Sequence, residues 1–463
     1  MKKITHLNSK ENKNILLWCS PGFGLVDIWL PVIRELKKHG VEIGFIFPEP
    51  STLRLEERET SLFKISEKFA DKVIYRGYSG RWFISPTLTV AKSSIRFSKI
   101  DQKIGFLARR LTRGKASKYL VLKIIGKYFL ALSKYFLRIK ENRSQQSLYD
   151  FRSLKGADGI LLDITVENKL VNDNLRNDLK GIPRFSMVHG LAPYWLTARF
   201  ICKQSVLKRS DVVVYSMSHL EVSGYKKCYG ILEENIVHVG IPKHDSNWIE
   251  FISNQPGQSK EKVFDSFVFI IGRAASPFNT VERKKKALKD IYDIVCIKHG
   301  LKLVVKTHPK ESINGIDGDI YMNALGKDNY GKDWLYSNLH PFILGKKALF
   351  AISFYSGVSL DMAAINKPTI EYLDLEGLPL YDKKDSLRDK LGKPVFQFRY
   401  ADLVLGASSK ADLEEHIESI FLQYETTFLP LHSRYKEYFK PIDGSSVTVA
   451  NDIIRRLYKT VVI

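Results

Sequence analysis

The feature that most constrains the fold is a regular alternation of short apolar runs with amphipathic stretches, separated by glycine turns. Near the N-terminus NILLWCS is followed by PGFGLVD, by IWLPVIRELKKHG and then by VEIGFIFPEP. The first and last segments have the continuous apolar character of buried strands, whereas IWLPVIRELKKHG has the period of an amphipathic helix that stops at Gly40. Strand, turn, helix and strand form a βαβ unit, which predicts a parallel sheet with right-handed crossovers.

The alternation continues along the chain in two series. Apolar runs at 159–164, 183–190, 211–218 and 235–242 complete the first series, and the polar, Pro- and Gly-containing stretch 252–266 follows it. The second series comprises FVFIIG, ERKKKALKDIYDIVCIKHG, LKLVVKTHP, ALFAISFYSG and KPTIEYL. A chain of 463 residues is also too long for one core. We therefore predict an α/β protein with two facing Rossmann-like domains, 1–251 and 267–463, joined by the linker 252–266 and ending in a helix.

Composition narrows the class of protein. No apolar stretch reaches the roughly 18 residues that a membrane-spanning helix needs, and the polar N-terminal sequence MKKITHLNSKENKN does not resemble a signal peptide. The four cysteines are Cys19, Cys202, Cys228 and Cys296. Because they show no CxxC spacing, they predict a reducing compartment and no zinc site. We therefore expect a cytoplasmic protein.

Most of the net charge of +22 lies in one segment, residues 76–143, which has 17 Lys and Arg residues against two acidic residues. Within it, Lys123, Lys127, Lys134 and Arg138 fall on one face of a predicted amphipathic helix, and apolar residues fill the rest. This pattern fits a core helix with a solvated lysine face, or a helix that lies on the anionic inner face of the membrane. Nucleic acid is disfavoured, because the aromatic residues do not alternate with basic ones.

A histidine lies where a predicted strand ends in the second series, in VKTHPKE. The residue before a proline is held extended, which places His308 at the carboxyl edge of the sheet, where ligands bind in open α/β folds. There His308 could donate a hydrogen bond or a proton to a phosphate oxygen, and Lys306 and Lys310 would add positive potential. The alternative is a surface histidine in a basic loop.

Two further blocks follow predicted strands. In SFYSGVSLDMAAINKPTIEY, Tyr355, Ser356 and Gly357 form a turn before a short helix, where backbone N–H groups and the Ser356 hydroxyl could hold a phosphate. In MVHGLAPYW, His189 is a candidate general base for an acceptor hydroxyl. Each block alone also fits an ordinary loop. Together, on facing domains, they predict a group-transfer enzyme with a nucleotide-activated donor.

The order of these blocks resembles the CDP-glycerol glycerophosphotransferase (teichoic-acid polymerase) family and related GT-B transferases that use CMP-activated sugars. The matching blocks are VHG, the Gly-x-Pro followed by Asp in GIPKHD, KTHP, YSGVSLDMAAINKP and IDGSS. The resemblance implies a GT-B fold, donor-phosphate contacts from His308 and Ser356, and His189 as the base. It also places Glu371, in KPTIEY, where many GT-B enzymes hold the donor ribose.

The resulting expectation is a glycosyltransferase of bacterial surface polysaccharide synthesis, peripheral on the inner face of the membrane. It would transfer a sugar or polyol phosphate from a CMP- or CDP-activated donor to a glycan or lipid-linked acceptor. One alternative is an enzyme like the UDP-sugar 2-epimerases, and another is a basic membrane-binding protein with a degenerate site. Since no DxD-like pair follows a strand, we expect neither an essential metal nor a cofactor.

Overall fold

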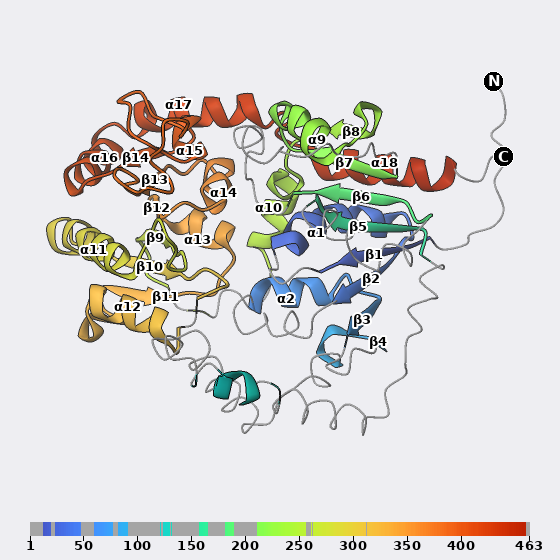
Figure 1. Cartoon of the computed structure of the whole chain (residues 1–463), viewed down its shortest axis with the longest axis horizontal. Helices are drawn as coiled ribbons and strands as arrows, with labels where there is room; N and C mark the ends of the chain where they lie inside the picture. The colour runs from blue at the N-terminus through green and yellow to red at the C-terminus, as the bar shows by residue number, and fades with distance from the viewer. Residues whose placement is uncertain are drawn as a thin grey trace. The chain divides into compact units, whose positions relative to one another are not determined.

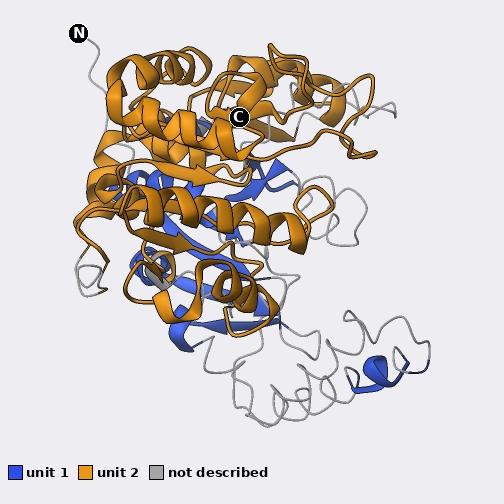
Figure 2. Ribbon diagram, turned by 90° about the vertical axis from the view of Figure 1, so that its left-hand side faces the viewer, with its two compact units in different colours: residues 1–56, 64–186, 450–463 blue, residues 57–63, 187–449 orange. Residues whose placement is uncertain are grey.

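The computed structural model describes residues 13–19, 24–47, 60–76, 82–90, 121, 124–129, 131, 157–164, 181–188, 211–255, 261, 263–311 and 313–459. Figure 2 shows the two compact units into which the chain divides. One comprises residues 1–56, 64–186 and 450–463, and the other comprises residues 57–63 and 187–449. The predicted linker at 252–266 stays a prediction.

The first sheet has eight strands in the order β4-β3-β2-β1-β5-β6-β7-β8 (Figure 1). These are β1 (Asn14–Trp18), β2 (Glu42–Phe47), β3 (Lys72–Arg76), β4 (Trp82–Ser85), β5 (Gly159–Asp163), β6 (Arg184–Met187), β7 (Val212–Ser216) and β8 (Ile236–His238). β1 pairs in parallel with β2 and β5, as the apolar runs predict, whereas β4 is antiparallel to β3. The helices in this part of the chain are α1 (Gly24–Lys38), α2 (Thr60–Glu67), α9 (Val222–Tyr229) and α10 (Ser246–Ser253).

The second sheet has six strands in the order β11-β10-β9-β12-β13-β14. They are β9 (Val268–Ile271), β10 (Leu303–Lys306), β11 (Trp334–Tyr336), β12 (Ala351–Ser353), β13 (Thr369–Tyr372) and β14 (Leu405–Ala407), and all neighbouring pairs are parallel. The helices of this region are α11 (Val281–Tyr292), α12 (Ile316–Leu325), α13 (Pro341–Lys347), α14 (Val358–Ala364), α15 (Gln397–Tyr400), α16 (Lys410–Leu422), α17 (Tyr424–Tyr438) and α18 (Ser445–Lys459). The predicted C-terminal helix is therefore confirmed as α18.

Alternation along the strands divides the second sheet into two faces. Ile270, Val305, Ile352 and Ile370 belong to one apolar cluster, which also contains side chains from α11, α12 and α16. The next residues along the strands point to the opposite face, where α14 packs on β12 and β13. The polar side chains Ser353 and Glu371 lie on that second face as register partners.

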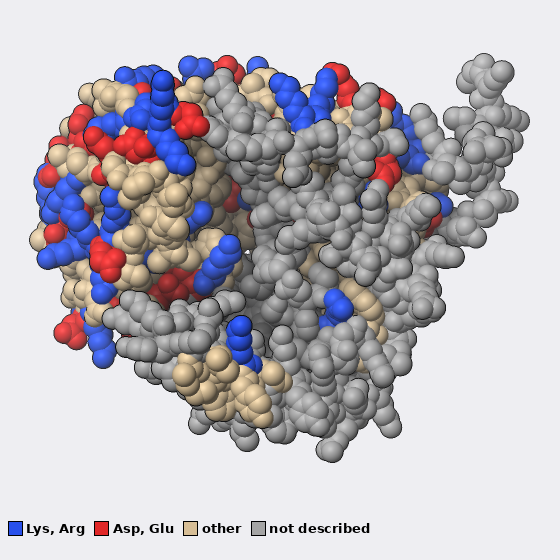
Figure 3. Space-filling view, in the orientation of Figure 1, with Lys and Arg blue, Asp and Glu red and all other residues tan. Residues whose placement is uncertain are grey.

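Residues 267–463, which contain the second sheet, contribute only a small part of the net charge of +22. Residues 267–463 carry 28 Lys and Arg residues against 24 Asp and Glu residues, and Figure 3 shows the two signs interspersed over the described surface. None of the helices in the described part of the chain has the length and hydropathy needed to cross a bilayer. Cys228 is disulfide-bonded, which the scattered cysteine pattern did not predict.

Candidate functional site

The order of the second sheet creates a topological switch point between β9 and β12. Read from β9, the chain adds β10 and β11 on one side of the sheet and then β12, β13 and β14 on the other. The loops that leave β9 and β12 therefore diverge, and ligands of open α/β sheets bind outside the carboxyl ends of such strands. Gly272 and Arg273 follow β9, and Tyr355, Ser356 and Gly357 follow β12.

Arg273 links the two loops at the switch point. Its Nη1 donates a hydrogen bond to the carbonyl oxygen of Tyr355 at 2.8 Å. The guanidinium carbon lies 5.2 Å from the ring centroids of both Tyr355 and Phe278, within cation–π range. Sequence reasoning missed this residue, although an Arg directly after the apolar run FIIG was a usable signal. It places a fixed positive charge at the carboxyl edge.

His308 lies at this edge as the sequence predicts, two residues after the end of β10. The backbone N–H of Lys310 donates to His308 Nδ1 at 3.1 Å, so the neutral imidazole carries its proton on Nε2. Burial, together with the cations Arg273, Lys310 and Lys284, lowers the pKa of His308 to about 4. At neutral pH the residue is therefore a hydrogen-bond donor rather than a proton donor.

A buried carboxylate holds the loop that carries His308. Glu311 accepts the backbone N–H of His308 at 2.6 Å and the hydroxyl of Tyr321 at 3.1 Å, and it forms a fully buried ion pair with Lys284 of α11. Gly272 is required beside it, because an added Cβ would lie 2.8 Å from Glu311 Oε2. No local pattern in the sequence predicts this ion pair, because its members lie 27 residues apart.

The two lysines that flank His308 differ in environment. Lys306 is buried, and its Nζ lies 3.5 Å from the carbonyl oxygen of Asn338, which follows β11. Lys310 is exposed, and its contact with His308 is made by its backbone N–H. The structure thus places one lysine of the predicted pair in the sheet and the other at the surface.

The turn after β12 has an unusual backbone. Tyr355 has a φ of 73°, in the left-handed region that bulky residues rarely adopt. The Ser356 hydroxyl accepts the N–H of Val358 at 3.3 Å, so it caps the first turn of α14. Gly357 has an ordinary helical backbone, with open space around its Cα. The strained residue of this predicted phosphate-binding turn is therefore Tyr355.

Glu371 lies on β13. Its side chain is buried, and Oε2 has no hydrogen-bond partner among the described residues. Burial raises the pKa of Glu371 to about 7, although Arg399 and Arg273 oppose the shift. The Ser353 hydroxyl, on the neighbouring strand in register, also lacks a partner in the described part of the chain. Buried polar atoms without partners are rare in native structures, which marks this position as a candidate ligand contact.

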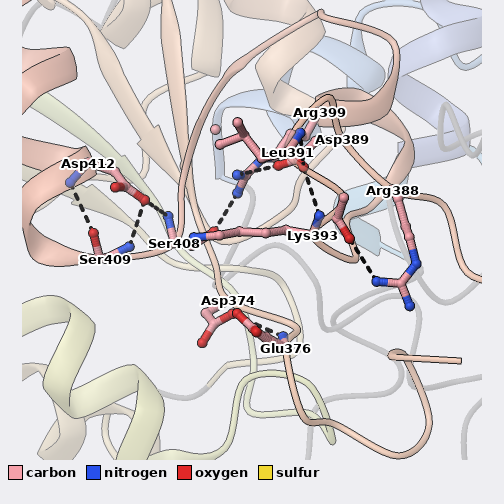
Figure 4. Close-up of polar contacts among 12 residues, drawn as sticks. Asp374, Glu376, Arg388, Asp389, Leu391, Lys393, Arg399, Ser408, Ser409 and Asp412 are labelled. Carbon is pink, nitrogen blue, oxygen red and sulfur yellow. Dashed lines mark hydrogen bonds and ion pairs between the residues drawn. The ribbon is translucent and has the colours of Figure 1, made fainter.

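Arg399 lies near Glu371 and is held from two sides. Its guanidinium donates to Asp389 Oδ2 at 2.7 Å and to the Ser408 hydroxyl at 2.8 Å (Figure 4). Gly406, the register partner of Glu371 on β14, leaves room for it, because a Cβ there would lie 2.1 Å from Arg399 Nε. This second cation was also absent from the sequence-based site.

The remaining predicted site residues fall largely outside the described residues. These are His189, Lys123, Lys134 and Arg138. Lys127 is described and exposed. Their predicted roles as base and as membrane contacts stay predictions.

No family model matches the sequence, and no curated protein is significantly similar to it. Solved structures are similar in fold. A structure from Listeria monocytogenes assigned to the UDP-N-acetylglucosamine 2-epimerases is 10% identical, with 96% of this chain and 95% of that chain covered and a TM-score of 0.52. The UDP-GlcNAc 2-epimerase from Methanocaldococcus jannaschii in complex with UDP-GlcNAc and UDP is 13% identical, with coverages of 97% and 99% and a TM-score of 0.51.

A variant of the wall teichoic acid polymerase TagF is 11% identical, with coverages of 97% and 90%, but its TM-score of 0.49 is too low to support an argument. At these identities the likeness shows the fold alone. The predicted α/β fold of GT-B type is confirmed. The more specific resemblance to teichoic-acid polymerases stays a prediction.

Proposed function

We propose that this protein is an enzyme that binds a nucleotide-activated sugar at the carboxyl edge of the second sheet. The observation that carries the proposal is the grouping at one switch point of Arg273, a neutral His308 and a buried Glu371 with an unpartnered oxygen. Arg273 and His308 supply N–H donors for phosphate oxygens, and the Glu371 carboxylate is an acceptor for ribose hydroxyls. When the bond between sugar and nucleotide breaks, the same donors stabilise the charge that develops on the phosphate.

Two reactions begin with cleavage of the bond between the sugar and the nucleotide. The first is epimerisation of a UDP-sugar, which is favoured by the likeness to epimerase structures, one of them in complex with UDP-GlcNAc and UDP. The second is transfer from a CMP- or CDP-activated donor to a glycan or lipid-linked acceptor, with His189 as base, which is favoured by the order of the VHG, KTHP and YSG blocks. The fold alone does not choose between them.

Thermal unfolding with nucleotides tests the binding step. A ligand at one hundred times its Kd adds about 2.7 kcal/mol of stability, and for a chain of this size each kcal/mol raises Tm by roughly 2 to 4 °C. A larger shift with UDP than with CMP or CDP supports the epimerase reaction, and the reverse order supports transfer. No shift with any of the three contradicts the proposal.

An activity panel then separates the reactions. The protein is incubated with UDP-GlcNAc or with CMP- and CDP-activated donors, and the sugar product and the free nucleotide are measured. An epimerised sugar that forms without an acceptor identifies the first reaction, whereas nucleotide release that depends on an acceptor identifies the second. Absence of turnover with every donor, in a protein that binds nucleotide, would leave a binding protein instead of an enzyme.

A membrane contact is proposed on a separate observation. Val121, Ile124 and Tyr128 share a helical face and are 67%, 57% and 71% exposed, whereas a core helix would bury them. The surrounding sequence 76–143 is strongly basic, so an anionic bilayer is the partner that fits both features.

Co-sedimentation with vesicles that contain anionic lipid tests this contact. We expect binding at low salt, loss of binding at 1 M salt, where the Debye length is about 3 Å, and loss in the variant I124D/Y128D. L391D changes an exposed leucine of the other unit and serves as the matched control. Absence of wild-type binding at low salt would remove the membrane from the proposal.

A further inference from the structure

Tyr355 has the most unusual backbone in the second unit. Three non-glycine residues of the described chain have a positive φ: Tyr355 at 73°, Asn366 at 61° and Asp402 at 53°. Asn and Asp are the side chains that tolerate this region, whereas a bulky residue there is an outlier. Such strain persists only where surrounding contacts impose it, and it gathers at functional sites.

Besides Arg273 and Phe278, one segment of the chain makes several contacts with the Tyr355 side chain. The ring of Tyr355 lies 4.2 Å from the ring of Phe396 and 5.6 Å from that of Phe398, measured between centroids. The side chain of Gln397, between them in sequence, donates a hydrogen bond to the Tyr355 hydroxyl. Three consecutive residues, 396–398, therefore contact the side chain of Tyr355.

These three residues belong to the long connection 373–404 between β13 and β14. Apart from the short helix α15 it has little regular structure, and connections of this length inside a compact unit are usually functional. It is nevertheless braced: Asp389 accepts the N–H groups of Leu391 and Lys393 at 3.0 and 2.9 Å and the guanidinium of Arg399 at 2.7 Å (Figure 4). The segment is thus firm enough to hold Tyr355.

The left-handed backbone of Tyr355 affects the switch point between β9 and β12. Tyr355 in its left-handed conformation presents its carbonyl oxygen to Arg273 and starts the Ser356–Gly357 turn. We propose that Tyr355 is a positioning residue, clamped by the 373–404 segment, whose left-handed turn aims Arg273 and the Ser356–Gly357 turn at the phosphates of the donor. This inference rests on the proposed function and adds to it a segment that controls nucleotide affinity.

The test compares three substitutions by calorimetric titration with UDP and CDP. Y355F keeps the ring and loses one hydrogen bond, so its Kd should stay within about threefold of wild type. Y355A loses the ring and, since alanine avoids a positive φ, should bind at least about tenfold more weakly. Y355G also loses the ring but can still adopt the turn, so it should bind at least about threefold more tightly than Y355A.

The order of the three Kd values distinguishes a positioning role of Tyr355 from a role in packing alone. If Tyr355 only fills space, Y355G removes one more carbon and binds no better than Y355A. Equal affinity of the two variants, or wild-type affinity in both, would overturn the clamp. Circular dichroism confirms that each variant is folded before titration.

Three further variants complete the experiment. N366A and N366G probe a left-handed residue just beyond the far end of α14, and both should retain wild-type nucleotide affinity. F396A removes the closest ring of the clamp without changing Tyr355, and it should weaken binding at least about fivefold. Wild-type affinity in F396A refutes the clamp alone, whereas a wild-type protein that binds neither UDP nor CDP refutes the proposed function and the clamp with it.

Discussion

Two polar clusters of the second unit contain the same kinds of group and differ in how completely these groups are satisfied. At the carboxyl edge of the sheet, Glu371 has an unpartnered oxygen and His308 is held neutral with a proton on Nε2. On α14, Asp361 is buried between two donors, Lys243 Nζ at 2.7 Å and His244 Nε2 at 2.8 Å. The other nitrogen of His244 lies 2.8 Å from the hydroxyl of Tyr435 on α17.

This difference distinguishes candidate ligand-binding residues, which have unpartnered polar atoms, from structural residues, whose polar atoms are paired within the chain. A buried ion pair with both partners in place binds chain segments to one another, and here it joins the GIPKHD block to α14 and α17. The next residue, Asp245, accepts the backbone N–H groups of Ser445 and Ser446 at 2.9 and 2.7 Å, where α18 begins. The GIPKHD and IDGSS blocks therefore meet Asp361, from the helical part of the YSGVSLDMAAINKP block, in a structural cluster. The KTHP block and the YSG turn lie at the carboxyl edge.

The largest effect should come from breaking the closed cluster. D361N removes the buried negative charge that faces Lys243 and His244, and removal of one partner of a buried pair costs about 3 to 5 kcal/mol. Urea unfolding should show this loss, while nucleotide affinity of the folded fraction stays unchanged. D382N, which removes the partly exposed partner of Arg388, is the control and should change the free energy of unfolding far less. A D361N protein as stable as wild type would mean that the cluster does not hold the fold.

Removing the donor at the open cluster should affect turnover instead of stability. H308A loses one preorganised N–H donor to the developing charge, and we expect turnover to fall about 10²- to 10³-fold with unfolding unchanged. H39A, at an exposed histidine of the first unit, should behave as wild type. More than about a tenth of wild-type activity in H308A would exclude this role.

The pH dependence of stability sharpens the same contrast. The pKa of Glu371 is about 7 in the folded protein against 4.5 ordinarily, so the folded state binds more protons and its contribution to stability falls as pH rises from 4.5 to 7. E371Q removes this fall. Between pH 4.5 and pH 8, the free energy of unfolding of E371Q should rise relative to that of wild type by up to about 3 kcal/mol.

His308 acts in the opposite direction, and both proteins contain it. Its pKa is lowered from 6.5 to about 4, so its contribution to stability is lost as pH falls through that range. Urea unfolding at several pH values measures the difference between E371Q and wild type. E376Q, at an exposed glutamate after β13, is the control. Parallel pH profiles for E371Q and wild type would show that Glu371 does not titrate as proposed.

The smallest effect should come from chelation. If N–H donors alone neutralise the phosphates, EDTA should leave turnover unchanged within error. The assay uses the donor that gives activity in the panel, before and after dialysis against EDTA. Activity that is lost and then restored by Mg²⁺ would place a metal ion among the phosphate ligands.

Local patterns in the sequence predicted much of this architecture. Apolar runs with glycine turns gave the parallel strands, and the proline after His308 placed the histidine at a strand end. Both signals are local, because strand periodicity and the restriction before proline act over a few residues. For the same reason the blocks at the edge could be named, but Arg273 was overlooked and Tyr355 was read as an ordinary turn residue.

What the sequence by itself determined is therefore the alternation of strands and helices and the set of polar residues at the strand ends. Only the tertiary structure decided the state of those residues: the protonation of His308, the open oxygen of Glu371, the left-handed turn at Tyr355 and the closed pairing of Asp361 with His244, 117 residues away. The physical reason is that burial and partner geometry set pKa values and backbone strain, and both depend on groups that are distant in sequence and adjacent only after folding.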